Sequence, residues 1–97
     1  MEIAQEILRQ LGGAGRLKAM INARDFVGLP DGLRFKMMPG KGGCNMVEIK
    51  LNGADLYDVG FFKVRGLKFE QVAGCRGYYV DMLADAFRDE AGLAIRL

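Results

Sequence analysis

The chain has 97 residues and a formal net charge of +2, and it contains no serine, threonine, histidine or tryptophan. These absences remove the commonest nucleophile, the commonest general base and the commonest metal ligand, so enzymatic activity is not expected. A hydrophobic fraction of 51% is typical of a folded globular protein, and the length suits one domain spanning residues 1–97.

The first third of the chain predicts a helix, a strand and a long connection. Apolar residues within 3–11 recur at helical spacing, and Gly12 with Gly13 ends this helix, which we expect to cover one face of a sheet. Residues 16–21 alternate between apolar and polar side chains, which predicts a strand. Residues 22–32 then form a connection that closes in a turn containing Pro30.

The middle of the chain predicts antiparallel strands. Alternating apolar residues predict strands at 33–38, 45–51, 55–65 and 67–72. A glycine-rich loop separates the first two, which we therefore expect to form a hairpin. Gly60 is a candidate position for a bulge, and residues 74–77 predict a turn.

The spacing of the apolar residues changes towards the end of the chain. Residues 79–91 have helical spacing, Gly92 suits the helix end, and residues 93–97 alternate as a last strand. The predicted fold class is therefore α+β: a single small domain with an N-terminal helix, a mostly antiparallel sheet of about five to six strands, and a C-terminal helix followed by a short last strand.

Features that often carry chemistry lack their partners here. The loop around Lys41 has no hydroxyl residue to complete a phosphate-binding loop and precedes a strand rather than a helix. Cys44 and Cys75 have neither a histidine base nor the further ligands that a zinc site needs. We therefore expect no catalytic residue, no metal and no cofactor. The start of the chain lacks a signal-peptide pattern and no apolar run could span a membrane, so we expect a cytoplasmic protein with no membrane contact.

A stretch of mixed basic and aromatic residues is the first candidate binding face. Residues 61–69 interleave these types, as in strands that stack bases and hold phosphates. In an extended strand Phe61, Lys63 and Arg65 share one face. The candidate residues are Phe61, Lys63, Arg65, Lys68, Arg76 and Tyr78. The alternative is an amphipathic strand whose aromatic residues fill the core while its cations are solvated.

A row of carboxylates is the second candidate binding face. Asp81, Asp85 and Asp89 repeat every four residues opposite the apolar side of the predicted C-terminal helix. They form either an ordinary solvated helix face or an acidic patch for a basic partner.

Several segments together resemble a family of small, mostly uncharacterised proteins encoded by phages, prophages and other mobile elements. The segments that carry this resemblance are residues 6–13, 55–59, 63–69 and the closing helix with residues 91–93. The resemblance covers most of the chain and implies a phage-borne context, but it supplies no site residues.

These observations favour a non-enzymatic binding protein. The first hypothesis is a phage or mobile-element accessory protein that binds a host protein complex in the host cytoplasm, such as an inhibitor of a defence system of the CRISPR kind. Residues 16–80 carry a net charge of +5, which supports a second hypothesis of a small nucleic-acid-binding module. A third is a structural or assembly protein of a virion or mobile element that pairs with a partner, or with a copy of itself, through residues 93–97.

Overall fold

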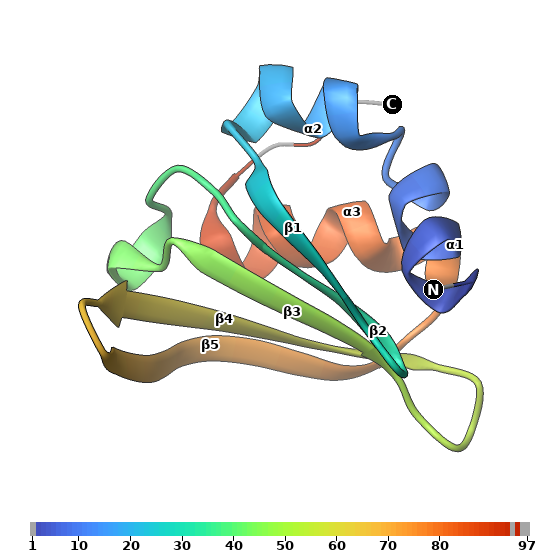
Figure 1. Ribbon diagram of the computed structural model, residues 1–97. Helices are drawn as coiled ribbons and strands as arrows, with labels where there is room; N and C mark the ends of the chain where they lie inside the picture. Colours follow the sequence, from blue (N-terminus) through green and yellow to red (C-terminus); the bar gives the residue numbers. More distant parts are fainter. Residues whose placement is uncertain (1, 94, 96–97) are drawn as a thin grey trace.

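A five-stranded antiparallel sheet carries the helices on one of its faces (Figure 1). The structure is a computed structural model that describes residues 2–93 and 95. The strands are β1 (Arg24–Leu29), β2 (Gly32–Lys36), β3 (Met46–Leu51), β4 (Tyr57–Arg65) and β5 (Lys68–Tyr78). Their order in the sheet is their order in the chain, so each strand pairs with its sequence neighbour. The predicted α+β class is confirmed, with five strands.

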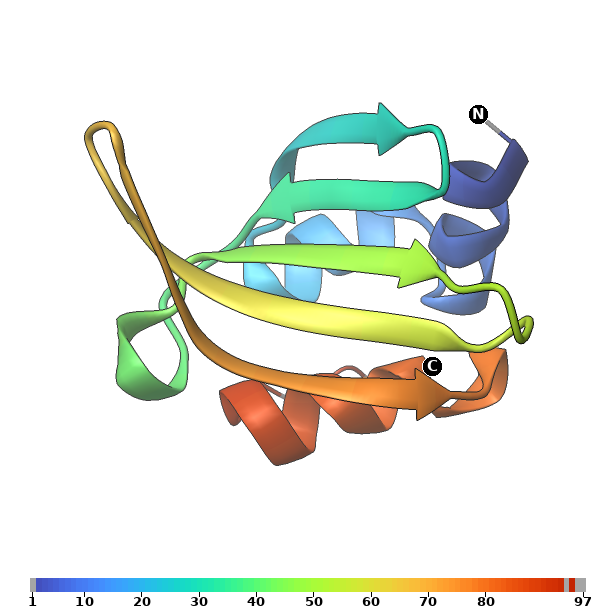
Figure 2. The same cartoon turned by 90° about the horizontal axis from the view of Figure 1, so that it is seen from below.

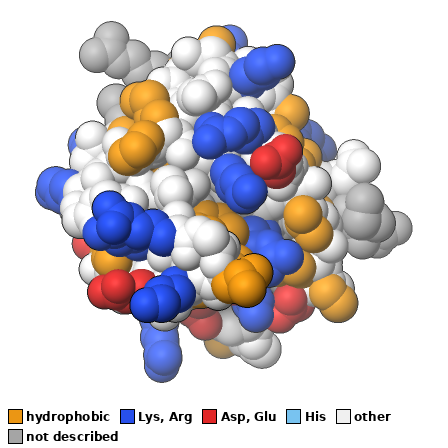
Figure 3. Space-filling model, turned by 60° about the vertical axis from the view of Figure 1, so that its left-hand side comes forward, with side chains coloured by type: hydrophobic (Ala, Val, Ile, Leu, Met, Phe, Trp, Pro, Cys, Tyr) orange, Lys and Arg blue, Asp and Glu red, His pale blue; other side chains and the backbone are white. Residues whose placement is uncertain are grey.

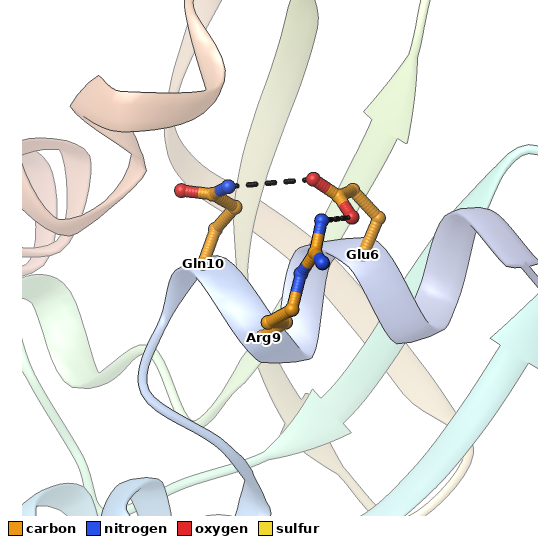
Figure 4. Close-up of polar contacts among 3 residues, drawn as sticks. All are labelled: Glu6, Arg9 and Gln10. Carbon is orange, nitrogen blue, oxygen red and sulfur yellow. Dashed lines mark hydrogen bonds and ion pairs between the residues drawn. The ribbon is translucent and has the colours of Figure 1, made fainter.

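The N-terminal helix α1 (Glu2–Gln10) forms where the helical spacing predicts it. Ile7 and Leu11 are fully buried against the sheet. On the opposite side, the carboxylate of Glu6 accepts hydrogen bonds from the guanidinium of Arg9 and, at 3.3 Å, from the side-chain amide of Gln10 (Figure 4). The helix is therefore amphipathic, with one packed and one solvated face.

The strand predicted at residues 16–21 is wrong, because this segment is helix α2 (Ala14–Ile21). Leu17 and Ile21 are both fully buried, whereas Ala19 between them is exposed. A spacing of four residues places two side chains on the same face of a strand and on the same face of a helix, so the alternation was ambiguous. Asn22 ends the helix in a left-handed conformation with φ 56°.

The predicted connection at residues 22–32 contains strand β1. It pairs with β2 through Val27 opposite Arg34 and Leu29 opposite Gly32. The strand lies at one edge of the sheet, its side chains are mostly exposed, and its register shifts between Arg24 and Val27. An edge strand with few buried residues shows no apolar alternation, so its sequence resembles a loop.

Strands β2 and β3 form the predicted hairpin, with Phe35 opposite Val47. The loop between them contains the short 3₁₀ turn η1 (Lys41–Gly43). The turn predicted at residues 74–77 is wrong, because β5 continues through it to Tyr78.

Strand β5 contains both irregularities of the β4–β5 pairing. Phe61 is opposite Ala73 while Phe62 is opposite Gln71, so β5 has one extra residue there. A second shift lies between the pairs of Tyr57 and Val59. The bulge expected at Gly60 is absent, because Gly60 pairs regularly with Gly74.

The C-terminal helical segment packs on the same sheet face as α1 but changes type along its length. It comprises the 3₁₀ turn η2 (Val80–Met82), the α-helical turn α3 (Leu83–Ala86) and the π-helical segment η3 (Phe87–Ala91). Gly92 ends it with φ 67°. The predicted helix at 79–91 is thus present in altered form. The strand predicted at 93–97 falls mostly outside the described residues, since 94, 96 and 97 are not described.

Three phenylalanines connect the sheet to this helical segment. The ring of Phe87 stacks on Phe35 with centroids 6.1 Å apart and meets Phe61 edge-on at 5.3 Å. All three are fully buried, and across the described part of the chain no charged residue is buried. The core lies between the helices and one face of the sheet, and it includes the hydroxyl-bearing Tyr57 and the thiol of Cys44 among its otherwise apolar side chains.

Candidate functional site: the open face of the sheet

The second face of the sheet has no helix over it, and we call it the open face. Figure 2, seen from below, shows the strands in front of the helices. Because side chains alternate along a strand, the residues that follow the buried Val47 and Val59 lie on this face. Glu48 and Gly60 are paired there across β3 and β4. The open face is thus defined by the same alternation that builds the core.

The open face contains a hollow of about 660 Å³. It is lined by Gly60 and Gly74, which are directly paired across β4 and β5. A Cβ atom on Gly74 would lie 2.7 Å from the side-chain Nε2 of Gln71, and one on Gly60 would lie 3.0 Å from the ring of Phe62, so these two side chains lie over the glycines. Six side chains line the hollow: Glu48, Lys50, Asp58, Phe62, Gln71 and Arg76.

Charged groups of both signs surround the hollow. The carboxylate of Glu48 lies 3.5 Å from the guanidinium of Arg34 and 3.7 Å from the ammonium of Lys50. Asp58 accepts hydrogen bonds from the side-chain amide of Asn52 at 3.2 Å and from the backbone N–H of Gly77 at 3.0 Å. These contacts hold both carboxylates in place at the rim.

Arg76 differs from the other charged groups of the hollow. It is exposed, and within the described ranges 2–93 and 95 no ion pair or hydrogen bond engages its guanidinium. An arginine presents five donors in a planar fork that suits phosphate and carboxylate groups. Arg76 is therefore available to an anionic ligand without breaking an existing contact.

Two aromatic side chains lie in a row on the open face. Phe62 is opposite Gln71, and Phe69 is opposite Val64, one step further towards the end of the β4–β5 hairpin. Residues in this diagonal relation are roughly 7–8 Å apart. Phe69 is 58% exposed. The row leads from the hollow to the hairpin tip, where Leu67 is 100% exposed.

Cations gather at the end of the sheet to which this hairpin points. At this end β1 begins, β2 ends and the chain turns from β4 into β5. The 3₁₀ turn η1 lies beside it, against β4 and β5. We call this region the basic end; its residues are Arg24, Lys36, Lys41, Lys63, Arg65 and Lys68. The two nearby carboxylates are Asp25, 3.7 Å from the ammonium of Lys36, and Glu70, opposite Lys63. Figure 3 shows Lys and Arg side chains outnumbering acidic ones on this side.

The predicted basic-aromatic face is divided by the structure. Phe61 belongs to the core and is fully buried against Phe87, so its proposed place in a binding surface is wrong. Lys63 lies partly buried beside η1, and Tyr78 lies on the helix side next to Cys75.

Three of the predicted residues do reach the surface at the site described here. Arg65 and Lys68 are opposite one another at the hairpin end, and Arg76 is at the hollow. The sequence reasoning missed Phe62, Phe69 and Lys50. The signal that could have found them is the alternation of side chains along each strand, which defines the second face of the sheet as well as the first.

The predicted acidic helix face is exposed but partly neutralised. Arg88 lies 3.3 Å from Asp85 and 3.2 Å from Asp89. The hydrogen bond and charge of Asp89 raise the pKa of Arg88. Asp81 is exposed in η2, apart from these pairs. The three aspartates therefore form a weak acidic surface.

The two thiols are unsuited to nucleophilic chemistry. Cys44 is buried and Cys75 half-buried, and both are free. Burial raises the pKa of each thiol, and the charge of Glu90 raises that of Cys75 further. Both are therefore protonated near neutral pH, and a protonated thiol is a poor nucleophile.

Two absences among the described residues concern metals and membranes. Among residues 2–93 and 95, no group of three or more Cys, Asp and Glu side chains is placed to hold a metal ion. No helix in the same part of the chain is long and apolar enough to cross a bilayer.

Comparison with family models, with curated proteins and with solved structures finds no match to this chain.

Proposed function

We propose that this chain is a non-enzymatic protein that binds single-stranded nucleic acid along the open face of its sheet. The observation that carries the proposal is the row of Phe62 and Phe69 leading to the basic end. Antiparallel sheets that present aromatic residues on an uncovered face are a common platform for unpaired bases. The proposal needs no catalytic group.

The spacing of the row suits an extended strand of nucleotides. Successive bases stack on Phe69 and Phe62, while the phosphates lie at the edge of the hairpin within reach of Arg65 and Lys68, whose side chains leave the strands on the other face. Stacking of one base on an aromatic side chain contributes roughly 1–3 kcal/mol, and this contribution tolerates different base sequences. The cations add a salt-dependent attraction to phosphate.

Fluorescence anisotropy with labelled single-stranded DNA and RNA oligonucleotides tests the proposal. We expect binding at low salt that weakens as salt increases. Phe69→Ala should lower affinity by about tenfold, in line with the loss of one stacked base. The double variant Arg65→Ala/Lys68→Ala should weaken binding and also reduce its salt dependence.

The matched control is Lys18→Ala, which removes an exposed cation from α2 on the helix side. Lys18→Ala lowers the net charge by the same amount as Lys68→Ala, and it should leave the affinity for the oligonucleotide nearly unchanged. Equal losses for Lys18→Ala and Lys68→Ala, or no binding at low salt, would contradict the proposal.

A second candidate, binding to a host protein complex, is supported by the hairpin tip. Leu67 is fully exposed between the hairpin cations Arg65 and Lys68. A protruding apolar side chain with charged neighbours suits an interface centre. With the phage-like resemblance, this supports an inhibitor of a host defence complex.

The test of this second candidate is a phage plating assay in cells with active CRISPR immunity. Expression of the protein should restore plating, and Leu67→Asp should abolish that effect without unfolding the chain. Unchanged plating with the wild-type protein in hosts carrying different defence complexes would remove this candidate.

A further inference from the structure

We propose that the hollow on the open face is a subsite for one nucleotide whose base carries an exocyclic amino group. This inference rests on the proposed binding of single-stranded nucleic acid and names what occupies the hollow. Its volume of about 660 Å³ lies within the range of pockets that hold small ligands.

The floor of the hollow suits a planar ring because an aromatic side chain lies over its glycines. A Cβ on Gly60 would lie 3.0 Å from the ring of Phe62, and a Cβ on Gly74 would lie 2.7 Å from Nε2 of Gln71, so this ring and this amide cover the paired backbone. A base in the hollow therefore stacks on the ring of Phe62 and continues the row that begins at Phe69.

The rim supplies acceptors for the base. Glu48 is opposite Gly60, and its carboxylate has acceptor capacity beyond its two long ion pairs at 3.5 and 3.7 Å. Carboxylates accept hydrogen bonds from the amino groups of cytosine and adenine. The carbonyl oxygens of uracil would instead face this negative charge, so the hollow should disfavour uracil.

The cations of the rim suit the phosphate. Arg76 is exposed without a partner among the described side chains, and Lys50 makes only the 3.7 Å contact with Glu48. Arg76 on β5 and Lys50 on β3 flank the hollow from opposite sides. A phosphate held by Arg76 therefore leaves the base on the ring of Phe62, next to Glu48, which is paired with Gly60 beneath that ring.

Titration of the full chain with AMP, CMP and UMP, followed by NMR chemical shifts, tests the inference. We expect AMP and CMP to shift the amide signals of Gly60 and Gly74. UMP should bind about five- to tenfold more weakly, which corresponds to the contribution of one contact to a base edge. Inorganic phosphate alone should produce shifts only near Arg76.

Three variants separate the roles of the rim and the floor. Arg76→Ala should weaken all three nucleotides alike, whereas Glu48→Gln should remove the preference over UMP while keeping the shape of the rim. Gly60→Ala should displace the ring of Phe62 from the floor of the hollow, and its thermal melt establishes whether the fold is retained. Arg16→Ala, an exposed cation on α2, is the control for Arg76→Ala.

The outcomes distinguish this inference from the proposed function. Oligonucleotide binding without nucleotide-induced shifts at Gly60 and Gly74 would overturn the nucleotide subsite and leave the proposed function standing. Equal affinity for UMP and AMP would overturn the role of Glu48. Nucleotide binding with no oligonucleotide binding would support the subsite and overturn the single-strand proposal.

Discussion

The two faces of the sheet are built from the same strands yet have opposite character. The helix-covered face contributes Phe35, Val47 and Phe61 to a core without a buried charged residue in the described part of the chain. The open face alternates with it and presents Glu48, Lys50 and a floor of glycines. One face therefore stabilises the fold, and the other is left free to bind.

This contrast is sharpest between two neighbouring phenylalanines. Phe61 is fully buried, whereas Phe62 is partly exposed at the hollow. Adjacent residues of the same type thus have separate roles, and mutation of each should affect a different property.

The largest expected effect is the loss of stability on Phe61→Ala. Removing a fully buried ring that contacts Phe87 edge-on should cost about 3–5 kcal/mol of unfolding free energy. The matched variant Phe62→Ala should cost less than half of that and instead weaken oligonucleotide binding. Urea denaturation and anisotropy measure the two properties, and an equal stability loss in both variants would break the distinction between the faces.

The next largest effect concerns a glycine needed for strand packing rather than binding. A Cβ on Gly32 would lie 1.9 Å from the carbonyl oxygen of Ile49, so Gly32→Ala should force β2 and β3 apart at a cost of about 3 kcal/mol. Gly53→Ala is the control, since nothing lies within 4 Å of its Cβ position. Comparable melting temperatures for the two variants would refute this prediction.

A smaller effect is expected from the residue that fixes the projecting hairpin. The side chain of Asn45 accepts a hydrogen bond from the N–H of Val64 at 2.8 Å and donates one to its carbonyl at 3.2 Å. Asn45→Ala should cost about 1–2 kcal/mol and loosen the hairpin.

Hydrogen exchange reports this loosening. Exchange at Val64 and its neighbours should accelerate in Asn45→Ala while exchange in β2 is unchanged. Asn45→Asp, which keeps the acceptor and loses the donor, should give an intermediate result. Uniform acceleration over the whole sheet would contradict a local role.

The smallest effect is a loss of stability at alkaline pH. Burial raises the pKa of Cys44, Cys75 and Tyr57 in the folded chain. The unfolded chain therefore releases these protons first, and the free energy of unfolding should fall as the pH rises above 9.0, the ordinary thiol value. Denaturation at pH 8 and at about pH 10 measures this slope; a rise in stability over that interval would contradict it.

Sequence patterns were reliable where one side of an element is buried. The helix at residues 3–11 and the hairpin of β2 and β3 were predictable because their apolar residues follow a single period. The pattern of helix α2 does not distinguish a helix from a strand, because Leu17 and Ile21 fit both periods, and edge strand β1 shows no strand pattern because little of it is buried.

The site was less predictable than the fold. The aromatic-basic composition of residues 61–69 drew attention to the correct hairpin, but the sequence does not say which of Phe61 and Phe62 faces the helices. The pairing of Gly60 with Gly74 joins residues 14 positions apart, and one register shift lies between this pair and the hairpin turn. Such a pair of glycines is visible only once the strands are paired.

The irregular pairing of β5 also governs how this protein meets copies of itself. A straight edge strand is a template for another strand, and aggregation of β proteins often begins there. β5 has two register shifts, and β1 at the opposite edge has a third, with Asp25 at φ 55°. Neither edge offers a continuous row of hydrogen-bonding groups, so the sheet should resist edge-to-edge polymerisation even though one of its faces is uncovered.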